Sequence, residues 1–129
     1  MSNRYCSQDN FAIALNEILQ EVVSDVDSTC YPAVRKTCKY ARDKVVENAE
    51  GYGWDSYPKG FKYTTSRRRL ESIGEVGNET KPGLVHLLEK GHAKMGGGRV
   101  AARPHVAPAA EEAFDYFWNQ IDEAVRRAL

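Results

Sequence analysis

The first part of the chain is dominated by apolar residues that recur at intervals of three and four. Between residues 11 and 26 the pattern comprises Phe11, Ala14, Leu15, Ile18, Leu19, Val22, Val23 and Val26. This spacing predicts an amphipathic helix, with Asp9 as a suitable N-cap. Because the apolar stripe is wide, the helix must pack against another surface.

A second helix is predicted after a short break at residues 27–29. Asp27, Ser28 and Thr29 are residue types that begin helices, and Pro32 is tolerated in a first turn. This helix is expected to run to about Asn48, with an apolar face made of Tyr31, Val34, Cys38, Ala41, Val45 and Ala49. So short a break favours an antiparallel helix pair.

The following segment predicts a small antiparallel β-hairpin. A turn-rich aromatic loop at residues 51–60 precedes two extended segments, at 61–66 and 69–76. In the first segment Phe61, Tyr63 and Thr65 share one side of the strand. Gly77 and Asn78 then end the hairpin with a turn.

A short helix and a glycine-rich loop are expected next. Leu84, Leu87 and Leu88 form the predicted buried side of the helix, which starts just before Pro82. Gly91 ends it, because glycine enters a left-handed conformation at little cost. Residues 94–102 include three consecutive glycines, and they predict a mobile basic loop that orders on assembly.

The chain closes with a long predicted helix. Pro108 is placed at its first position, Glu111 and Glu112 in its first turn, and Arg126 and Arg127 in its last turn. Its predicted buried face consists of Ala110, Ala113, Phe114, Phe117, Ile121, Ala124 and Val125. These elements together predict a single α+β domain over residues 1–129.

Composition narrows the class of protein. The 129 residues contain no apolar run of about 18 residues and no signal-like N-terminus, so neither a membrane span nor secretion is expected. Three cysteines without Cys-x-x-Cys spacing favour a reducing compartment, with Cys38 as a buried apolar residue. Net charge is zero, yet residues 59–105 hold ten basic and four acidic residues, which makes this segment +6 and the remainder −6. Such polarity suits a subunit that meets neighbours through oppositely charged faces, or one that lies near nucleic acid.

The three histidines form the sharpest candidate for chemistry. His86, His92 and His105 lie within twenty residues, and Glu89 follows His86 by one helical turn. If these side chains converge, they could hold a metal, and a small metal-dependent, nuclease-like enzyme is one alternative function. No recognised metal motif accompanies them, so we expect no metal, no cofactor and no catalysis.

Two basic features suggest other contacts. Arg67, Arg68 and Arg69 form a short run that could contact phosphates, which makes a DNA-binding accessory module a further alternative. The Gly96–Arg99 stretch lacks the Gly-Lys-Ser/Thr pattern of a P-loop, so no nucleotide site is expected there.

The stretch from Leu84 to Pro108 resembles a known signature. It reads LVHLLEKGHA at residues 84–93, then GGGRV at 96–100, then RPHVAPA at 103–109. In order and spacing these parts are similar to the gene-product-ten-like family of tailed-bacteriophage minor structural proteins, in which the equivalent of Val106 is commonly isoleucine.

The resemblance implies a virion component without catalytic activity. It implies a homo-oligomeric ring at the head–tail junction, neck or tail end, assembled in the host cytoplasm beside head-closure, connector, tail-tube or tail-terminator proteins. DNA would pass through the lumen, and Arg67, Arg68 and Arg69 are the candidate lumen contacts. The candidate assembly residues are His86, Glu89, Gly91, His92, Gly97, Gly98, Arg99, Arg103, Pro104, His105 and Pro108.

Overall fold

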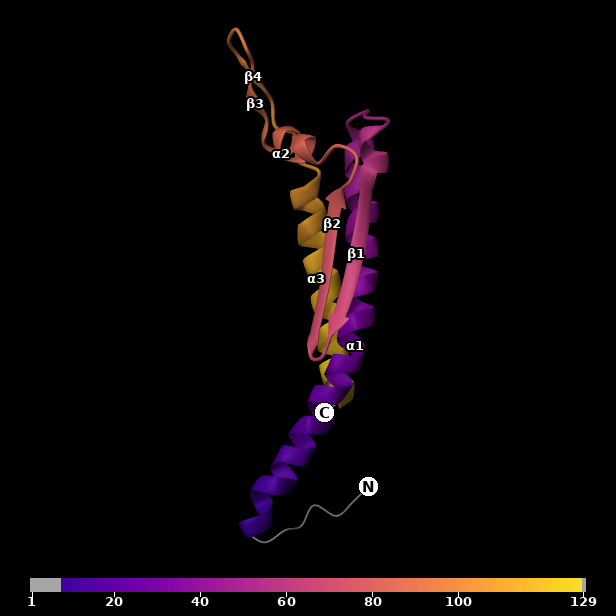
Figure 1. Cartoon of the computed structure of the whole chain (residues 1–129), viewed down its shortest axis with the longest axis vertical. Coiled ribbons are helices and arrows are strands. Elements are labelled where there is room, and N and C mark those ends of the chain that lie inside the picture. The colour runs from indigo at the N-terminus through magenta and orange to yellow at the C-terminus, as the bar shows by residue number, and fades with distance from the viewer. Residues whose placement is uncertain (1–7, 129) are drawn as a thin grey trace.

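The protein is an elongated assembly of helices and two hairpins (Figure 1). The computed structural model describes residues 8–128. In chain order the elements are α1 (Gln8–Gly51), a 3-10 turn η1 (Tyr57–Gly60), β1 (Phe61–Arg68), β2 (Glu71–Asn78), α2 (Pro82–Lys90), β3 (His92–Ala93), β4 (Arg99–Val100) and α3 (Val106–Ala128). The expected α+β class, with a hairpin, a short helix and a long C-terminal helix, is confirmed.

The predicted break at residues 27–29 is wrong, because α1 is one helix of 44 residues. The Ser28 and Thr29 hydroxyls donate to the carbonyl oxygen of Asp25, at 2.8 and 3.1 Å. These side chains therefore bond back to the preceding turn instead of capping a new helix. Pro32 stays inside α1, and the helix bends between its N-terminal part and the part beneath the hairpin (Figure 1).

The hairpin β1–β2 lies along the C-terminal part of α1 and confirms the predicted hairpin, but Gly77 and Asn78, which were expected to form a turn, end strand β2 and pair with Lys62 and Phe61. Its register runs from Phe61 opposite Asn78 to Arg68 opposite Glu71, so only two residues form the turn. Phe61 is buried and Tyr63 and Thr65 are half-buried, which confirms the face expected for this strand. The Tyr31 and Thr65 hydroxyls lie 3.2 Å apart and tie the strand to α1.

Helix α3 packs along α1, and the small core gathers at the C-terminal end of α1. It contains Val45, Ala49, Tyr57, Phe61 and Ala109. Farther along the pair, the rings of Tyr40 and Tyr116 stack with centroids 4.6 Å apart. Cys38 is buried as expected, and burial raises the pKa of its thiol.

Several side chains predicted to be buried are instead exposed. On α3, Phe114 is 65% exposed, and on α2 both Leu84 and Leu87 lie in water. On α1, Ile18, Leu19 and Val23 belong to the predicted packing stripe but are also exposed. The other predicted positions have side chains outside the described part of the structure: Asp9, Phe11, Ala14, Leu15 and Val22. The apolar patterns of these helices therefore include side chains that the folded chain does not bury.

The glycine-rich segment forms a second hairpin, where the sequence predicted an irregular loop. His92 pairs with Val100 and Ala93 with Arg99. Lys94 N–H donates to the carbonyl of Gly98 at 3.0 Å, which closes the turn. This hairpin projects from one end of the molecule, next to α2 (Figure 1). Within residues 8–128, no helix combines the length and apolar character needed to cross a membrane.

Candidate assembly site

Glu89, in the last turn of α2, caps the start of α3. Its carboxylate accepts the backbone N–H groups of His105, Val106 and Ala107 at 2.9, 2.8 and 3.0 Å. A helix start leaves its first N–H groups without intrahelical partners and carries partial positive charge. The Glu89 carboxylate accepts hydrogen bonds from these N–H groups, and its negative charge complements the partial positive charge. These hydrogen bonds connect the end of α2 to the start of α3 and so fix the orientation of α3 relative to α2.

The cap also corrects the predicted start of α3. The helix begins at Val106, so Pro108 is its third residue and not its first. Glu111 and Glu112 consequently fall in the second turn. The negative charge at the helix start comes from Glu89 on α2, which lies 17 residues away in sequence from Val106.

The environment of Glu89 favours its charged form. Partial burial raises the pKa of this carboxyl, but the three backbone N–H groups and the nearby His105 ring lower it, and the net pKa lies below its ordinary value. Hydrogen bonds to the charged form thus outweigh desolvation.

His105, the residue before α3, is fully buried and held at both ring nitrogens. Nδ1 lies 2.8 Å from the carbonyl oxygen of Arg103 and 3.0 Å from the Glu89 carboxylate, while Nε2 lies 2.8 Å from the Tyr57 hydroxyl. Burial, with Glu89 nearby, raises the pKa of Tyr57 to about 12. Nδ1 faces two acceptor oxygens, so it carries a hydrogen and donates it to them, while Nε2 shares a hydrogen bond with the Tyr57 hydroxyl.

Aromatic rings enclose the histidine. Trp54, Tyr57 and Phe61 meet it edge-on, with centroids 5.2, 5.6 and 6.0 Å from the imidazole. Asn48 of α1 donates its side-chain amide to the carbonyl of His105 at 3.1 Å. These contacts bring α1, η1 and the start of α3 together. We name the set of Glu89, His105, Tyr57 and Trp54 the junction.

Two more residues of the predicted stretch attach to the junction. The Arg103 guanidinium lies over the Trp54 ring, 6.0 Å from its centroid, and the Arg103 N–H donates to the carbonyl of Leu88 at 2.8 Å. The carbonyl of Pro104 accepts the Tyr52 hydroxyl at 2.9 Å. The contacts of Arg103 and Pro104 therefore fix the position of the segment between the small hairpin and α3.

The remaining residues of the stretch form an arm, defined as residues 92–100. Gly91 precedes it at φ +74°, where a Cβ would meet the backbone of Val100 and Ala102, so only glycine fits this close approach. Gly97 and Gly98 both have positive φ at the tip, and Met95 is fully exposed. Arg99 donates to the carbonyl of Lys90 at 3.1 Å.

The structure divides the histidine cluster. His105 and Glu89 meet in the junction, but His86 is exposed on α2 and His92 lies in the arm, with Nδ1 lacking a hydrogen-bond partner among the described residues. Over residues 8–128, no three His, Cys, Asp or Glu side chains gather in a way that could hold a metal ion. The four side chains named as possible ligands therefore do not converge in the described part of the chain.

The arginine run lies at the tip of the long hairpin. Arg67 is tied to α1, since its guanidinium is 3.3 Å from the Asp27 carboxylate and lies over the Tyr31 ring. Arg68 and Arg69 are exposed at the turn, beside Leu70, whose φ is +58°. All three arginines are exposed, and Arg67 differs from the other two in its ion pair with α1.

Two important residues were missed by the sequence reasoning. Tyr57 sat in a segment predicted only as a loop, although its aromatic content was a signal of burial. Asn78 was taken as a turn residue, yet it is buried and donates to the carbonyl of Tyr57 at 2.9 Å, while its side-chain oxygen accepts from Lys81 N–H at 2.8 Å. It therefore fastens the end of the hairpin to η1 and to the start of α2.

Comparison with known proteins gives no relative: no family model, no curated protein sequence and no solved structure matches this chain.

Proposed function

We propose that this chain is a non-enzymatic structural subunit of a tailed bacteriophage or prophage virion. In this proposal it forms part of a homo-oligomeric ring at the neck, the head–tail connector or the tail end, and DNA passes through the lumen. The proposal starts from the resemblance carried by residues 84–108 and is supported by the surfaces that the fold leaves uncovered.

The observation that carries the proposal is the exposure of apolar faces on all three α-helices. Phe114 and Trp118 on α3 are 65% and 60% exposed, and Leu19 on α1 is 54% exposed. Soluble monomers seldom leave large apolar patches in water, whereas assembling subunits cover such patches with neighbours. A chain with a small core and long uncovered helices suits an assembled state.

The internal structure of the resembling stretch agrees with an assembly role. Its Glu89 and His105 build the junction, and its glycines and Arg99 build the arm. Glu89 is committed to three backbone N–H groups and His105 is buried against aromatic rings, so these residues hold an arm in place. Head-to-tail contacts made by such arms close into rings when the rotation between subunits allows it.

Virion incorporation is the direct test. If the proposal is correct, a phage or induced prophage that encodes this chain carries it in purified particles, and deletion of its gene yields heads and tails that do not join or tails that are incomplete. Complementation with the intact chain restores joined particles. Particles that lack the protein, or normal particles made without its gene, would refute the proposal.

A further inference from the structure

An apolar groove lies where α1, β2 and α3 meet. It has a volume of about 340 Å³, and its lining includes Val34 and Cys38 of α1, Val76 of β2, and Ala113, Phe114 and Phe117 of α3. Phe114 forms one rim and is mostly exposed, so the groove opens to the surface.

The rim of this groove on α3 is acidic and aromatic. Helical spacing places Glu111 and Asp115 beside Phe114 and Trp118 on the exposed face of the helix. Neither carboxylate has an ion-pair partner among the described residues, whereas Glu112 lies 3.8 Å from Lys44 of α1. Exposed aromatics next to unbalanced carboxylates fit an apolar partner that carries positive charge.

The arm has the matching chemistry. Residues 92–100 contain Lys94 and Arg99 and no acidic residue. Met95 is fully exposed at the tip, and Lys94 and Arg99 flank it in sequence and on the paired strand. Methionine is flexible and adapts to irregular apolar sites.

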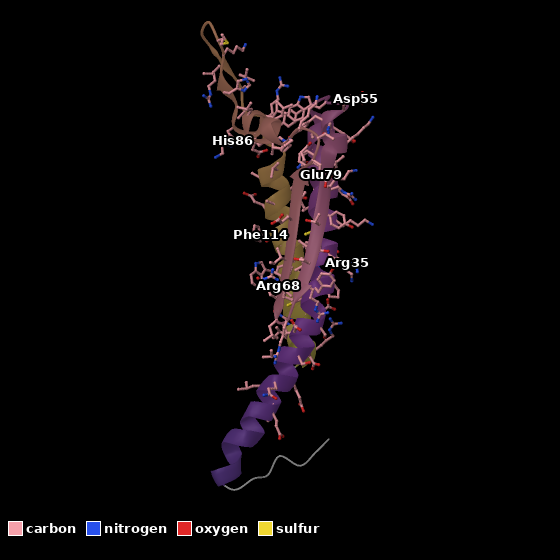
Figure 2. All side chains as sticks on the ribbon, viewed as in Figure 1. Arg35, Asp55, Arg68, Glu79, His86 and Phe114 are labelled. Carbon is pink, nitrogen blue, oxygen red and sulfur yellow. The ribbon has the colours of Figure 1, made fainter. Side chains whose placement is uncertain are left out.

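The arm of a given chain is far from the groove of the same chain. It extends beyond α2 at one end of the molecule, while Phe114 lies partway along the body (Figure 2). A contact between the two surfaces therefore needs two copies of the protein.

We propose that the arm of one copy docks in the α1–β2–α3 groove of a second copy. Met95 enters the groove beside Phe114, and Lys94 and Arg99 face Glu111 and Asp115. This inference rests on the proposed function, because it specifies one contact of the ring. The contact is heterologous, so each copy offers an arm to one neighbour and a groove to the other.

Charge argues against another occupant from the same chain. The N-terminal part of α1 is the alternative occupant, because its apolar residues Leu19 and Val23 are also exposed. However, residues 8–27 contain five acidic residues and no basic residue. Placing that segment against Glu111 and Asp115 would bring like charges together.

Charge reversal provides the first test. We expect the intact chain to self-associate in native mass spectrometry and sedimentation velocity. The double variant Lys94→Glu/Arg99→Glu should weaken association about tenfold or more, as should Glu111→Lys/Asp115→Lys. Mixing the two variants should restore mixed oligomers, because each supplies a surface complementary to the other. Arg68→Glu/Arg69→Glu is the matched control, since it makes the same charge change at the other hairpin and should associate like the intact chain.

Cross-linking provides the second test. In a background in which Cys6, Cys30 and Cys38 are replaced by serine or alanine, one chain carries Met95→Cys and another carries Phe114→Cys. A short thiol cross-linker should join the mixed chains and neither chain alone. Replacing the Phe114→Cys chain by Lys59→Cys, which places the thiol in a recess with Arg42 and Glu50 and not in the groove, should abolish the product.

The outcomes separate this inference from the proposed function. Loss of association in the arm and groove variants, with rescue on mixing, supports the arm-in-groove contact. Unchanged association in those variants, absence of the mixed cross-link, or an intact chain that stays monomeric and binds only a different virion protein overturns it. Virion incorporation is measured separately, so the structural role can stand while this contact fails.

Discussion

Replacement of Glu89 by glutamine tests the junction most directly. The wild-type carboxylate accepts three N–H groups within 3.0 Å and is only 15% exposed. A glutamine oxygen can still accept from His105 and Val106, but its amide group then faces the N–H of Ala107 as a second donor. One hydrogen bond and the charge at the helix start are lost.

These losses set the expected magnitude. A helix cap or a hydrogen bond to a charged group contributes about 1–2 kcal/mol, and the helix dipole adds a few tenths to about 1 kcal/mol. We therefore expect Glu89→Gln to lower the free energy of unfolding by about 1–2 kcal/mol, and Glu89→Ala by about 2–3 kcal/mol. For a domain of this size the Tm should fall by about 3–5 °C per kcal/mol.

The pH dependence supplies an independent check with a definite sign. The pKa of Glu89 is lower in the folded protein than its ordinary value of 4.5. Its ionised form therefore contributes stability above that value, and the contribution is lost as pH falls through the folded pKa. The difference between wild type and Glu89→Gln should be constant near neutral pH and shrink in acid.

The assay is urea unfolding of both proteins, followed by circular dichroism over a pH series. Glu123→Gln is the matched control, because Glu123 is exposed on α3, lies outside the lining of the groove and makes no ion pair among the described residues. A Glu89→Gln variant within about 0.5 kcal/mol of wild type at neutral pH would refute the capping argument, since that is the usual range for surface substitutions.

Two further predictions concern the core and the hairpin. Tyr57→Phe leaves Nε2 of buried His105 without its hydrogen-bond partner and should cost about 1–3 kcal/mol in urea unfolding. Because the pKa of Tyr57 rises from 10.0 to about 12 on folding, wild-type stability should fall as pH rises through that interval, and the variant should lack this share of the fall. Gly74→Ala should cost about 1–3 kcal/mol, because the added Cβ would collide with the Cys38 sulfur. Gly77→Ala, on the same strand with open space around its Cβ, should cost clearly less, and equal losses would argue against the packing of β2 on α1.

The sequence predicted the elements whose local signals agree with one another. Alternating Phe61, Tyr63 and Thr65 marked the buried face of β1, and Gly91 marked the end of α2. It failed at residues 27–29, where serine and threonine can cap a helix forward or bond back to the preceding turn with equal chemistry. The hairpin favours the second option, since Arg67 reaches Asp27 at the start of the expected break and Thr65 reaches Tyr31 just after it.

The candidate site, too, was only partly predictable from the sequence. Its residues were visible from the sequence as a run of histidines, glycines and arginines, but their partners were not. Glu89 meets Ala107 across 18 positions, and His105 meets Tyr57 across 48. Contacts at such separations leave no periodic trace, so the division into junction and arm emerged only from the folded chain.

By itself, the sequence determined which faces are apolar, where charge accumulates and which segments can be helix or strand, because these depend on side-chain chemistry at short range. Only the tertiary structure decided which apolar faces the chain covers. Phe114 carries the periodicity of a core residue, yet it lies at the rim of the α1–β2–α3 groove and is 65% exposed. Burial depends on what other elements supply, and on α3 the missing cover is the basis of the proposed contact with a second copy.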